Sequence, residues 1–179
     1  MEATRTDMRF VDNQLNLATF EVQGRICALE VSLVKEIVRC QAVTPLPMAP
    51  SLIEGVIDLR GAIIPVLDLG LALGGEPVNA NEPRARIVIV DSDSLILGLR
   101  VAAAVDVLSL PVTAMEDPPA LAMQAGYDAV RGVVRRDGES PVMVLSLDYI
   151  LESVYRSGTS NSSATAPNQD RVSGQGEAA

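Results

Sequence analysis

An arginine and two carboxylates stand close together in residues 55–70, GVIDLRGAIIPVLDLG, and are the side chains whose spacing could most readily do chemistry. Asp58 and Asp68 flank the Arg60–Gly61 pair, so they could supply a general acid and a general base. No nucleophile or metal ligand converges on them, and the alternation of apolar and polar residues is typical of strands. We therefore interpret both carboxylates as solvated charges and Arg60–Gly61 as the corner of a hairpin.

A second pair of carboxylates, Asp91 and Asp93, has the spacing with which a calcium-binding loop begins. The glycine at the sixth position and the closing glutamate of such a loop are missing, so a polar hairpin turn is predicted. Gly70, Gly74 and Gly75 form no phosphate-binding pattern. The sequence therefore predicts neither a metal site nor a cofactor.

The composition excludes several functional classes. The 179 residues include no histidine, which removes Ser-His-Asp and Cys-His nucleophilic sites, histidine-based zinc sites and any phosphoaccepting histidine. A net charge of −9 without a basic stripe argues against nucleic-acid binding. Cys27 and Cys40 stand in apolar stretches and are predicted to be buried thiols. A charged N-terminus, without any apolar run of about 20 residues, predicts a cytoplasmic protein.

The elements that must position the Arg60–Gly61 corner are mostly β-hairpins, because apolar and polar residues alternate around glycine or polar turns. Residues 17–22 and 25–30 form the first predicted hairpin, and the strands around Arg60–Gly61 form the second. Segment 31–38 has the apolar spacing of a short helix, and 101–108 is interpreted as a second short helix that runs into a strand. The proline-rich segments 44–50 and 111–123 are predicted to be extended loops.

The two halves of the chain show weak internal symmetry. Gly55 and Gly61 stand six residues apart, as do Gly132 and Gly138, and a proline follows each pair within four residues. Repeat units of roughly 60–75 residues suit two small barrels. The predicted organisation is an N-terminal arm (1–15), two intertwined barrel subdomains (16–156, with a boundary near 75–85) and a disordered C-terminal tail (157–179).

KEIVR at 35–39, followed by TPLPMAPSLIEGVIDLRGAIIPVLDL at 44–69, resembles the CheW family of bacterial chemotaxis coupling proteins. The family pattern is Glu-Ile, a proline-containing loop, an Ile-x-Gly-Val-x-Asn-Leu-Arg-Gly corner and Ile-x-Pro-Val-x-Asp-Leu. Asp58 departs from it, since asparagine is usual there. The resemblance extends more loosely from Thr19 to Val154. It implies an all-β fold with short helices, in which two five-stranded SH3-like barrels pack together.

The resemblance also implies a function. CheW-like proteins are non-catalytic adaptors that bridge the cytoplasmic tips of methyl-accepting chemotaxis receptors to the regulatory domain of the chemotaxis histidine kinase. That kinase domain shares the fold, so the two can alternate in rings, and further copies of the adaptor could join them. Such a protein is cytoplasmic and is recruited to membrane-associated receptor arrays without inserting into the membrane.

An adaptor for a receptor helix bundle needs an apolar groove with a few polar orienting groups. The predicted helix over 31–38 and the Arg-Gly corner would supply both, with the Arg60 guanidinium paired to Glu36. The residues expected to bind the receptor are Val34, Glu36, Ile37, Arg60, Gly61, Ile63 and Val66. Exposed apolar residues of the two proline-rich loops are expected to bind the kinase: Val43, Leu46, Met48, Met115, Leu121 and Met123.

Two other functions remain open on the residues alone. The chain could be the regulatory module of a histidine kinase, cut away from the catalytic part. It could also be a small-ligand-binding or carboxylate-dependent enzyme barrel that uses the acidic residues around the corner. The last function predicts a concave pocket with raised carboxylate pKa values, and a filled barrel interior would argue against it.

Overall fold

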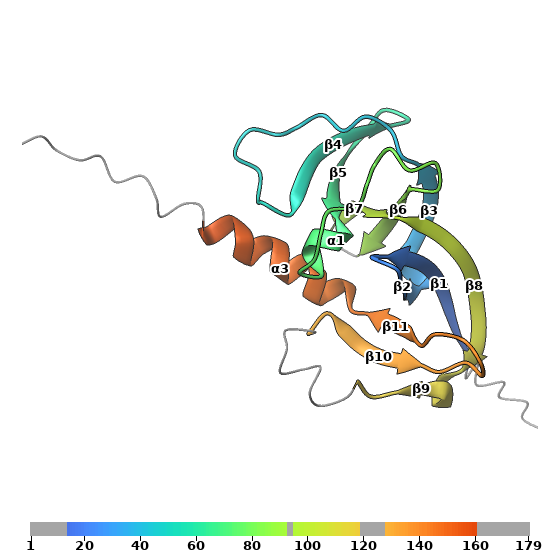
Figure 1. The fold of residues 1–179 in the computed structure, drawn as a ribbon. Coiled ribbons are helices and arrows are strands. Elements are labelled where there is room, and N and C mark those ends of the chain that lie inside the picture. The colour runs from blue at the N-terminus through green and yellow to red at the C-terminus, as the bar shows by residue number, and fades with distance from the viewer. Residues whose placement is uncertain (1–13, 93–94, 119–127, 161–179) are drawn as a thin grey trace, which may run out of the picture.

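The computed structural model describes residues 14–92, 95–118 and 128–160, which form two β-sheets and a few short helices (Figure 1). In chain order the elements are β1 (Gln14–Val22), β2 (Arg25–Glu30), η1 (Val31–Leu33), β3 (Val34–Arg39), β4 (Ile53–Leu59), β5 (Ala62–Asp68), α1 (Leu69–Ala72), β6 (Arg86–Ser92), β7 (Leu95–Val101), β8 (Ala103–Pro111), η2 (Val112–Ala114), β9 (Met115–Glu116), β10 (Val130–Val134), β11 (Val142–Leu145) and α3 (Leu147–Ser160). The expected all-β fold with short helices is confirmed.

One sheet has the strand order β8-β1-β2-β11-β10-β9, and the other has the order β3-β6-β7-β5-β4. The six strands of the first sheet exceed the expected five, because the two-residue β9 pairs with β10. The predicted hairpins β1–β2 and β4–β5 are both present and antiparallel. In Figure 1 the five-stranded sheet lies in the upper half of the molecule, and β9, β10 and β11 lie in the lower half.

The chain passes between the sheets after β2 and again after β7, so the first sheet combines strands from both ends of the described chain. The boundary expected near 75–85 is therefore not where the sheets divide, since β6 and β7 follow it and still belong to the five-stranded sheet. Parallel pairing of β2 with β11, at Cys27↔Met143, joins the two ends of the chain. A parallel pair needs a crossover connection, which here is the whole second sheet.

The helix expected over 31–38 is wrong, because only Val31–Leu33 forms a helical turn and Val34–Arg39 is strand β3. β3 pairs antiparallel with β6, and its register shifts between Val34 and Glu36. Burial still alternates along β3, but Glu36 takes a half-buried position and Ile37 an exposed one, so the residue types do not follow that alternation. Pairing with β6 then decides the structure, since strand propensity depends on such neighbours.

The helix expected at the start of 101–108 is also wrong, whereas the strand expected after it is present. This segment ends β7 and forms most of β8, which pairs with β1 through a register shift between Thr19 and Phe20. The Thr19 hydroxyl donates to the carbonyl oxygen of Asp106 at 2.9 Å and accepts from its amide at 3.0 Å. This side chain replaces ladder bonds that the bulge would otherwise lose.

The chain termini also differ from the expectation. Gln14 and Leu15 belong to β1 rather than to an N-terminal arm, and Leu15 is buried. At the other end α3 continues to Ser160, so 157–160 are helical rather than disordered, and the rest of the expected tail lies outside the described residues. α3 buries Leu147 and Ile150 against the main core, which is why it forms here.

A single hydrophobic cluster joins the two sheets. It combines Phe20 and Leu29 of the first sheet with Leu67 and Leu99 of the second, all fully or almost fully buried. A second cluster fills the interior of the five-stranded sheet with Ile57, Ile64, Val66, Ile87 and Ile89. The core therefore consists mostly of branched aliphatic residues, as the low aromatic content indicates, with Phe20 as its aromatic member. In the described part of the chain, no helix is long and apolar enough to cross a membrane.

Candidate protein-interaction site

The corner between β4 and β5 is a two-residue turn in which both central residues have positive φ. Arg60 has φ +54° and Gly61 has φ +86°, the combination found in type I′ hairpin turns. Gly61 tolerates this conformation because it lacks a Cβ, whereas an arginine seldom adopts it. Asp58 closes the turn, because its Oδ1 accepts a hydrogen bond from the Gly61 amide at 2.7 Å. The interpretation of Asp58 as merely solvated is therefore incomplete.

The Arg60 side chain reaches across to β3, where it forms the predicted ion pair with Glu36. Arg60 Nη2 lies 3.0 Å from Glu36 Oε2, and Nη1 lies 3.3 Å from Oε1. Two parallel contacts of this kind fix the plane of the guanidinium. The Arg60 side chain keeps 78% of its surface exposed, while Glu36 keeps 26%. The ion pair therefore orients a cation that still faces solvent.

This ion pair joins the two edge strands of the five-stranded sheet, β3 and β4, through the corner that follows β4. Two further contacts run along the same line. Gln41 Nε2 donates to the Asp58 carbonyl at 3.3 Å, and Thr44 and Val56 exchange backbone hydrogen bonds of 2.8 and 2.9 Å. We call this line of contacts the seam, which consists of Glu36, Gln41 and Thr44 on one side and Val56, Asp58 and Arg60 on the other.

Apolar side chains lie on the same strands as the ion pair. Ile63, just after the corner, is 66% exposed, and Ile37, next to Glu36, is 42% exposed. Val34 is half-buried. Val66 is fully buried among the isoleucines inside the sheet, so its expected place in a binding surface is wrong. Val66 and Leu67 are both buried, which shows that strict alternation fails at the end of β5.

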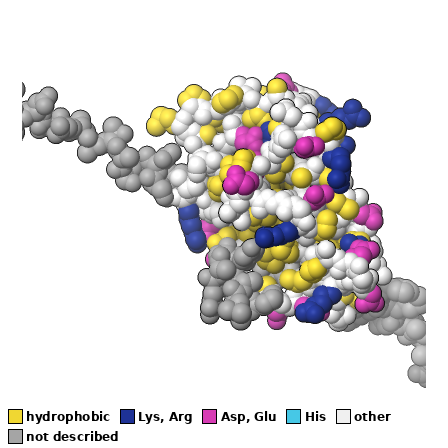
Figure 2. Space-filling view, in the orientation of Figure 1, with side chains coloured by type: hydrophobic (Ala, Val, Ile, Leu, Met, Phe, Trp, Pro, Cys, Tyr) yellow, Lys and Arg dark blue, Asp and Glu magenta, His cyan; other side chains and the backbone are white. Residues whose placement is uncertain are grey.

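The loop between β3 and β4 presents the candidate kinase-binding residues of the first half. Leu46 is 43% exposed and Met48 fully exposed, whereas Val43 is half-buried and packs against the interior isoleucines. Figure 2 shows hydrophobic side chains exposed over this loop, at the upper left of that face. Leu46 also lines a groove of about 330 Å³ against Leu151 and Tyr155 of α3.

The candidates of the second half are less exposed or not described. Met115, on β9, is half-buried and packs against the core of the six-stranded sheet. Leu121 and Met123 lie outside the described residues. Glycine 132 allows Met115 to pack here, because a Cβ at that position would lie 2.6 Å from the Met115 side chain.

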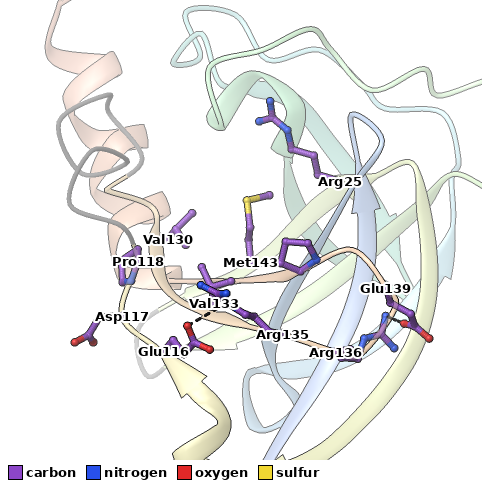
Figure 3. Close-up of a pocket in the computed structure, with 11 residues that line it drawn as sticks. Arg25, Glu116, Asp117, Pro118, Val130, Val133, Arg135, Arg136, Glu139 and Met143 are labelled. Carbon is purple, nitrogen blue, oxygen red and sulfur yellow. Dashed lines mark ion pairs between the residues drawn. The ribbon is translucent and has the colours of Figure 1, made fainter.

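Sequence reasoning missed a groove of about 540 Å³ between β9, β10 and β11. Val130, Val133 and Met143 form its apolar part, and Figure 3 shows the ion pair between Arg135 and Glu116 at its edge. Arg135 Nε lies 3.1 Å from Glu116 Oε2. The lining comes from segments far apart in the sequence, so no local pattern could have predicted it.

Exposed valines on β8 were not predicted from the sequence either. Val105 is 48% exposed and Val107 is 59% exposed, and Val107 shares a shallow hollow with Val31. The expectation of a helix within 101–108 concealed this strand, in which residues 104–107 are all exposed. A strand at the edge of the six-stranded sheet displays these side chains to solvent.

Buried charges lie inside the five-stranded sheet, away from the seam's exposed ion pair. Arg100 is 3% exposed, and its Nη2 lies 2.5 Å from Glu54 Oε2. Burial raises the pKa of Glu54; Arg100 opposes this rise, and nearby Asp68 adds to it. Asp68 is buried too, and its carboxylate accepts hydrogen bonds from the amides of Leu71 and Val78. The interpretation of Asp68 as a solvated charge is wrong, because it caps α1.

The packing of the interior and the placement of its acidic residues test the alternative function, a small-ligand-binding or carboxylate-dependent enzyme barrel. The interior of the five-stranded sheet is filled by isoleucine and valine side chains, which argues against a ligand site inside it. The raised pKa of Glu54 belongs to a carboxylate that is already paired with Arg100. Within the described residues, no group of three or more His, Cys, Asp or Glu side chains could hold a metal ion.

The fold and the exposed seam define a β protein of two subdomains whose most distinctive surface consists of an oriented arginine beside apolar residues. A family model described as a CheW-like domain matches residues 16–155. The chain therefore belongs to the CheW-like family of chemotaxis adaptor proteins, which confirms the resemblance.

Individual relatives agree with this assignment. The chain is 29% identical over 152 residues to chemotaxis protein CheW of Treponema pallidum, covering 83% of this chain and 89% of that protein. It is 31% identical over 142 residues to chemotaxis protein CheW of Rhizobium meliloti, covering 78% and 89%. The crystal structure of scaffolding protein TtCheW from Thermoanaerobacter tengcongensis superposes with a TM-score of 0.68 at 28% identity, covering 77% and 92%. The fold is accordingly the two-subdomain SH3-like fold of that scaffold.

Proposed function

We propose that this protein is a non-catalytic adaptor that couples methyl-accepting chemotaxis receptors to the regulatory domain of the chemotaxis histidine kinase. Its membership of the CheW-like family supports the adaptor class. In this proposal the protein resides in the cytoplasm and joins receptor arrays by binding receptor tips. It forms rings with the kinase domain, which other copies of the adaptor can enter.

The observation that carries the receptor side of the proposal is the geometry of Arg60. Its guanidinium is fixed by Glu36 at 3.0 Å and yet is 78% exposed, so it can donate further hydrogen bonds to a partner. Ile63 and Ile37 provide apolar surface on the same two strands. A fixed arginine next to apolar contacts is typical of the few residues that dominate a protein interface.

The kinase side of the proposal uses the loop between β3 and β4. Leu46 and Met48 are exposed there, and a flexible methionine adapts its shape to a partner surface. Met115, on β9, is half-buried, so only the exposed part of its side chain can contact the kinase. Leu121 and Met123 remain candidates for the same role by sequence.

The experiment that tests the receptor side compares two arginine variants. Arg84 is the matched control, since its Nη2 lies 3.2 Å from Glu21 Oε2 and its side chain is 71% exposed, but it is not part of the seam. We expect Arg60→Ala to weaken binding to a receptor cytoplasmic fragment by about tenfold or more, and Arg84→Ala to leave it within about twofold. Both variants should unfold within about 1 kcal/mol of the parent protein, because exposed ion pairs contribute little to stability. Unchanged receptor binding by Arg60→Ala would remove Arg60 from the site.

A further inference from the structure

Arg60 must be held in an unfavourable backbone conformation for its ion pair to form. A residue other than glycine rarely adopts positive φ, and within the described residues only Gln23, Met48 and Arg60 do so. If the corner relaxed to negative φ at Arg60, its side chain would leave the hairpin in another direction, away from Glu36. The local structure must therefore supply contacts that hold this conformation.

Asp58 supplies such contacts from two of its atoms. Its carboxylate Oδ1 accepts from the Gly61 amide at 2.7 Å, which closes the turn around Arg60. Its carbonyl oxygen accepts from Gln41 Nε2 at 3.3 Å, which ties the same residue to the opposite side of the seam. Asp58 is therefore bonded both to the turn that carries Arg60 and to the segment that follows the strand of Glu36.

A second hairpin turn of this type, within the described ranges, offers an internal comparison. Gln23 and Gly24, between β1 and β2, have φ of +52° and +72°. There the side chain of the strained residue fixes the turn, because Gln23 Nε2 donates to the carbonyl oxygens of Gly70 and Glu76 at 3.1 and 3.0 Å. The Arg60 side chain is likewise held by two contacts with Glu36, and the preceding Asp58 carboxylate adds a hydrogen bond to the backbone of the turn itself.

We propose that Asp58 is a positioning residue for the interaction surface, which holds the Arg60–Gly61 turn in the conformation that presents the guanidinium. The expected effect on receptor binding rests on the proposed function, whereas the role of Asp58 in holding the Arg60–Gly61 turn does not depend on it. Asparagine at position 58 would keep an oxygen acceptor for the Gly61 amide. Alanine would remove it and free the turn.

The test measures the conformation of the turn and the binding of the receptor fragment separately in Asp58→Ala and Asp58→Asn. Asp137→Ala is the control, because Asp137 is an exposed acidic residue beside Gly138 in the β10–β11 connection. By NMR, we expect the Gly61 amide of Asp58→Ala to exchange with solvent roughly tenfold faster, and the hydrogens on Nη1 and Nη2 of Arg60, which contact Glu36, to exchange faster too. Asp58→Asn and Asp137→Ala should leave both signals near those of the parent protein.

Binding to the receptor fragment is measured on the same variants and on the double variant Asp58→Ala/Arg60→Ala. We expect Asp58→Ala to weaken binding roughly three- to tenfold, and to have no further effect once Arg60 is absent. An equal loss in Asp58→Asn, an additive loss in the double variant, or unchanged Gly61 exchange in Asp58→Ala would overturn the inference. If the parent protein itself does not bind the fragment, the proposed function fails, while the NMR measurements still decide whether Asp58 positions Arg60.

Discussion

Gly55 on β4 lies so close to Thr44 that a Cβ at position 55 would be 2.1 Å from the Thr44 carbonyl oxygen. Its φ of +152° also lies in a region that other residues rarely adopt. The close approach allows Thr44 and Val56 to exchange two backbone hydrogen bonds, which attach the loop after β3 to β4. The seam therefore depends on the absence of a side chain at position 55.

Gly55→Ala is expected to destabilise the protein by about 2–4 kcal/mol, because the new methyl group would push Thr44 away from β4. Gly74→Ala is the control, since Gly74 has φ +77° but nothing within 4 Å of a built Cβ. Only the conformational cost, about 1 kcal/mol, should appear there. Urea unfolding monitored by circular dichroism measures both. Equal losses in the two variants would show that the contact with Thr44 does not matter.

Ile63 and Val66 should separate binding from stability, since the first is 66% exposed and the second fully buried. Ile63→Ala is expected to change the free energy of unfolding by less than about 0.5 kcal/mol, but to weaken receptor binding several-fold. Val66→Ala should cost about 2 kcal/mol of stability through the cavity it leaves. Thermal unfolding and pull-down of the receptor fragment give the two readouts. A binding defect in Val66→Ala at a temperature where it is fully folded would contradict this division.

Arg100 is buried and forms an ion pair with the half-buried Glu54, and removal of one partner should cost more than removal of both. Arg100→Met leaves the Glu54 carboxylate without its cation and is expected to cost about 3–5 kcal/mol. In the described part of the chain, the Nε and Nη1 atoms of Arg100 have no hydrogen-bond partner, so the pair is not fully compensated. The double variant Arg100→Met/Glu54→Gln should therefore recover most of the loss. Chemical denaturation of the parent protein, Arg100→Met, Glu54→Gln and the double variant completes the cycle, and additive losses would contradict a coupling between the two side chains.

Cys27 predicts a pH dependence of stability. Burial raises the pKa of this thiol to about 12 from its ordinary value of 9.0, so the folded protein retains the proton that the unfolded chain releases above pH 9. Stability should therefore fall as the pH rises above 9, by up to about 1.4 kcal/mol per pH unit from this thiol. Cys27→Ala should have a shallower slope between pH 9 and 10.5 in denaturant titrations. Parallel slopes for the two proteins would show that the thiol is not responsible.

The strands around the Arg60 corner could be predicted because the signals there are local. A glycine turn between alternating strands fixes a hairpin, and Arg60 and Glu36 form the expected ion pair. β3 could not be predicted, since its bulge and its pairing with β6 are set by residues some fifty positions later. The burial of Val66 depends on the parallel neighbour β7, and the groove at Val133 and Met143 depends on strands that only tertiary structure brings together.

The proposed adaptor function requires this protein to bridge a receptor and the kinase. Co-sedimentation of the kinase regulatory domain with a receptor cytoplasmic fragment assembled on vesicles, with and without the protein, tests this bridge. We expect the kinase domain to sediment with the receptor only when the protein is present, and Arg60→Ala to reduce the sedimented amount at least several-fold. Kinase sedimentation that is the same with and without the protein, at concentrations of tens of micromolar, would rule out the proposed bridge.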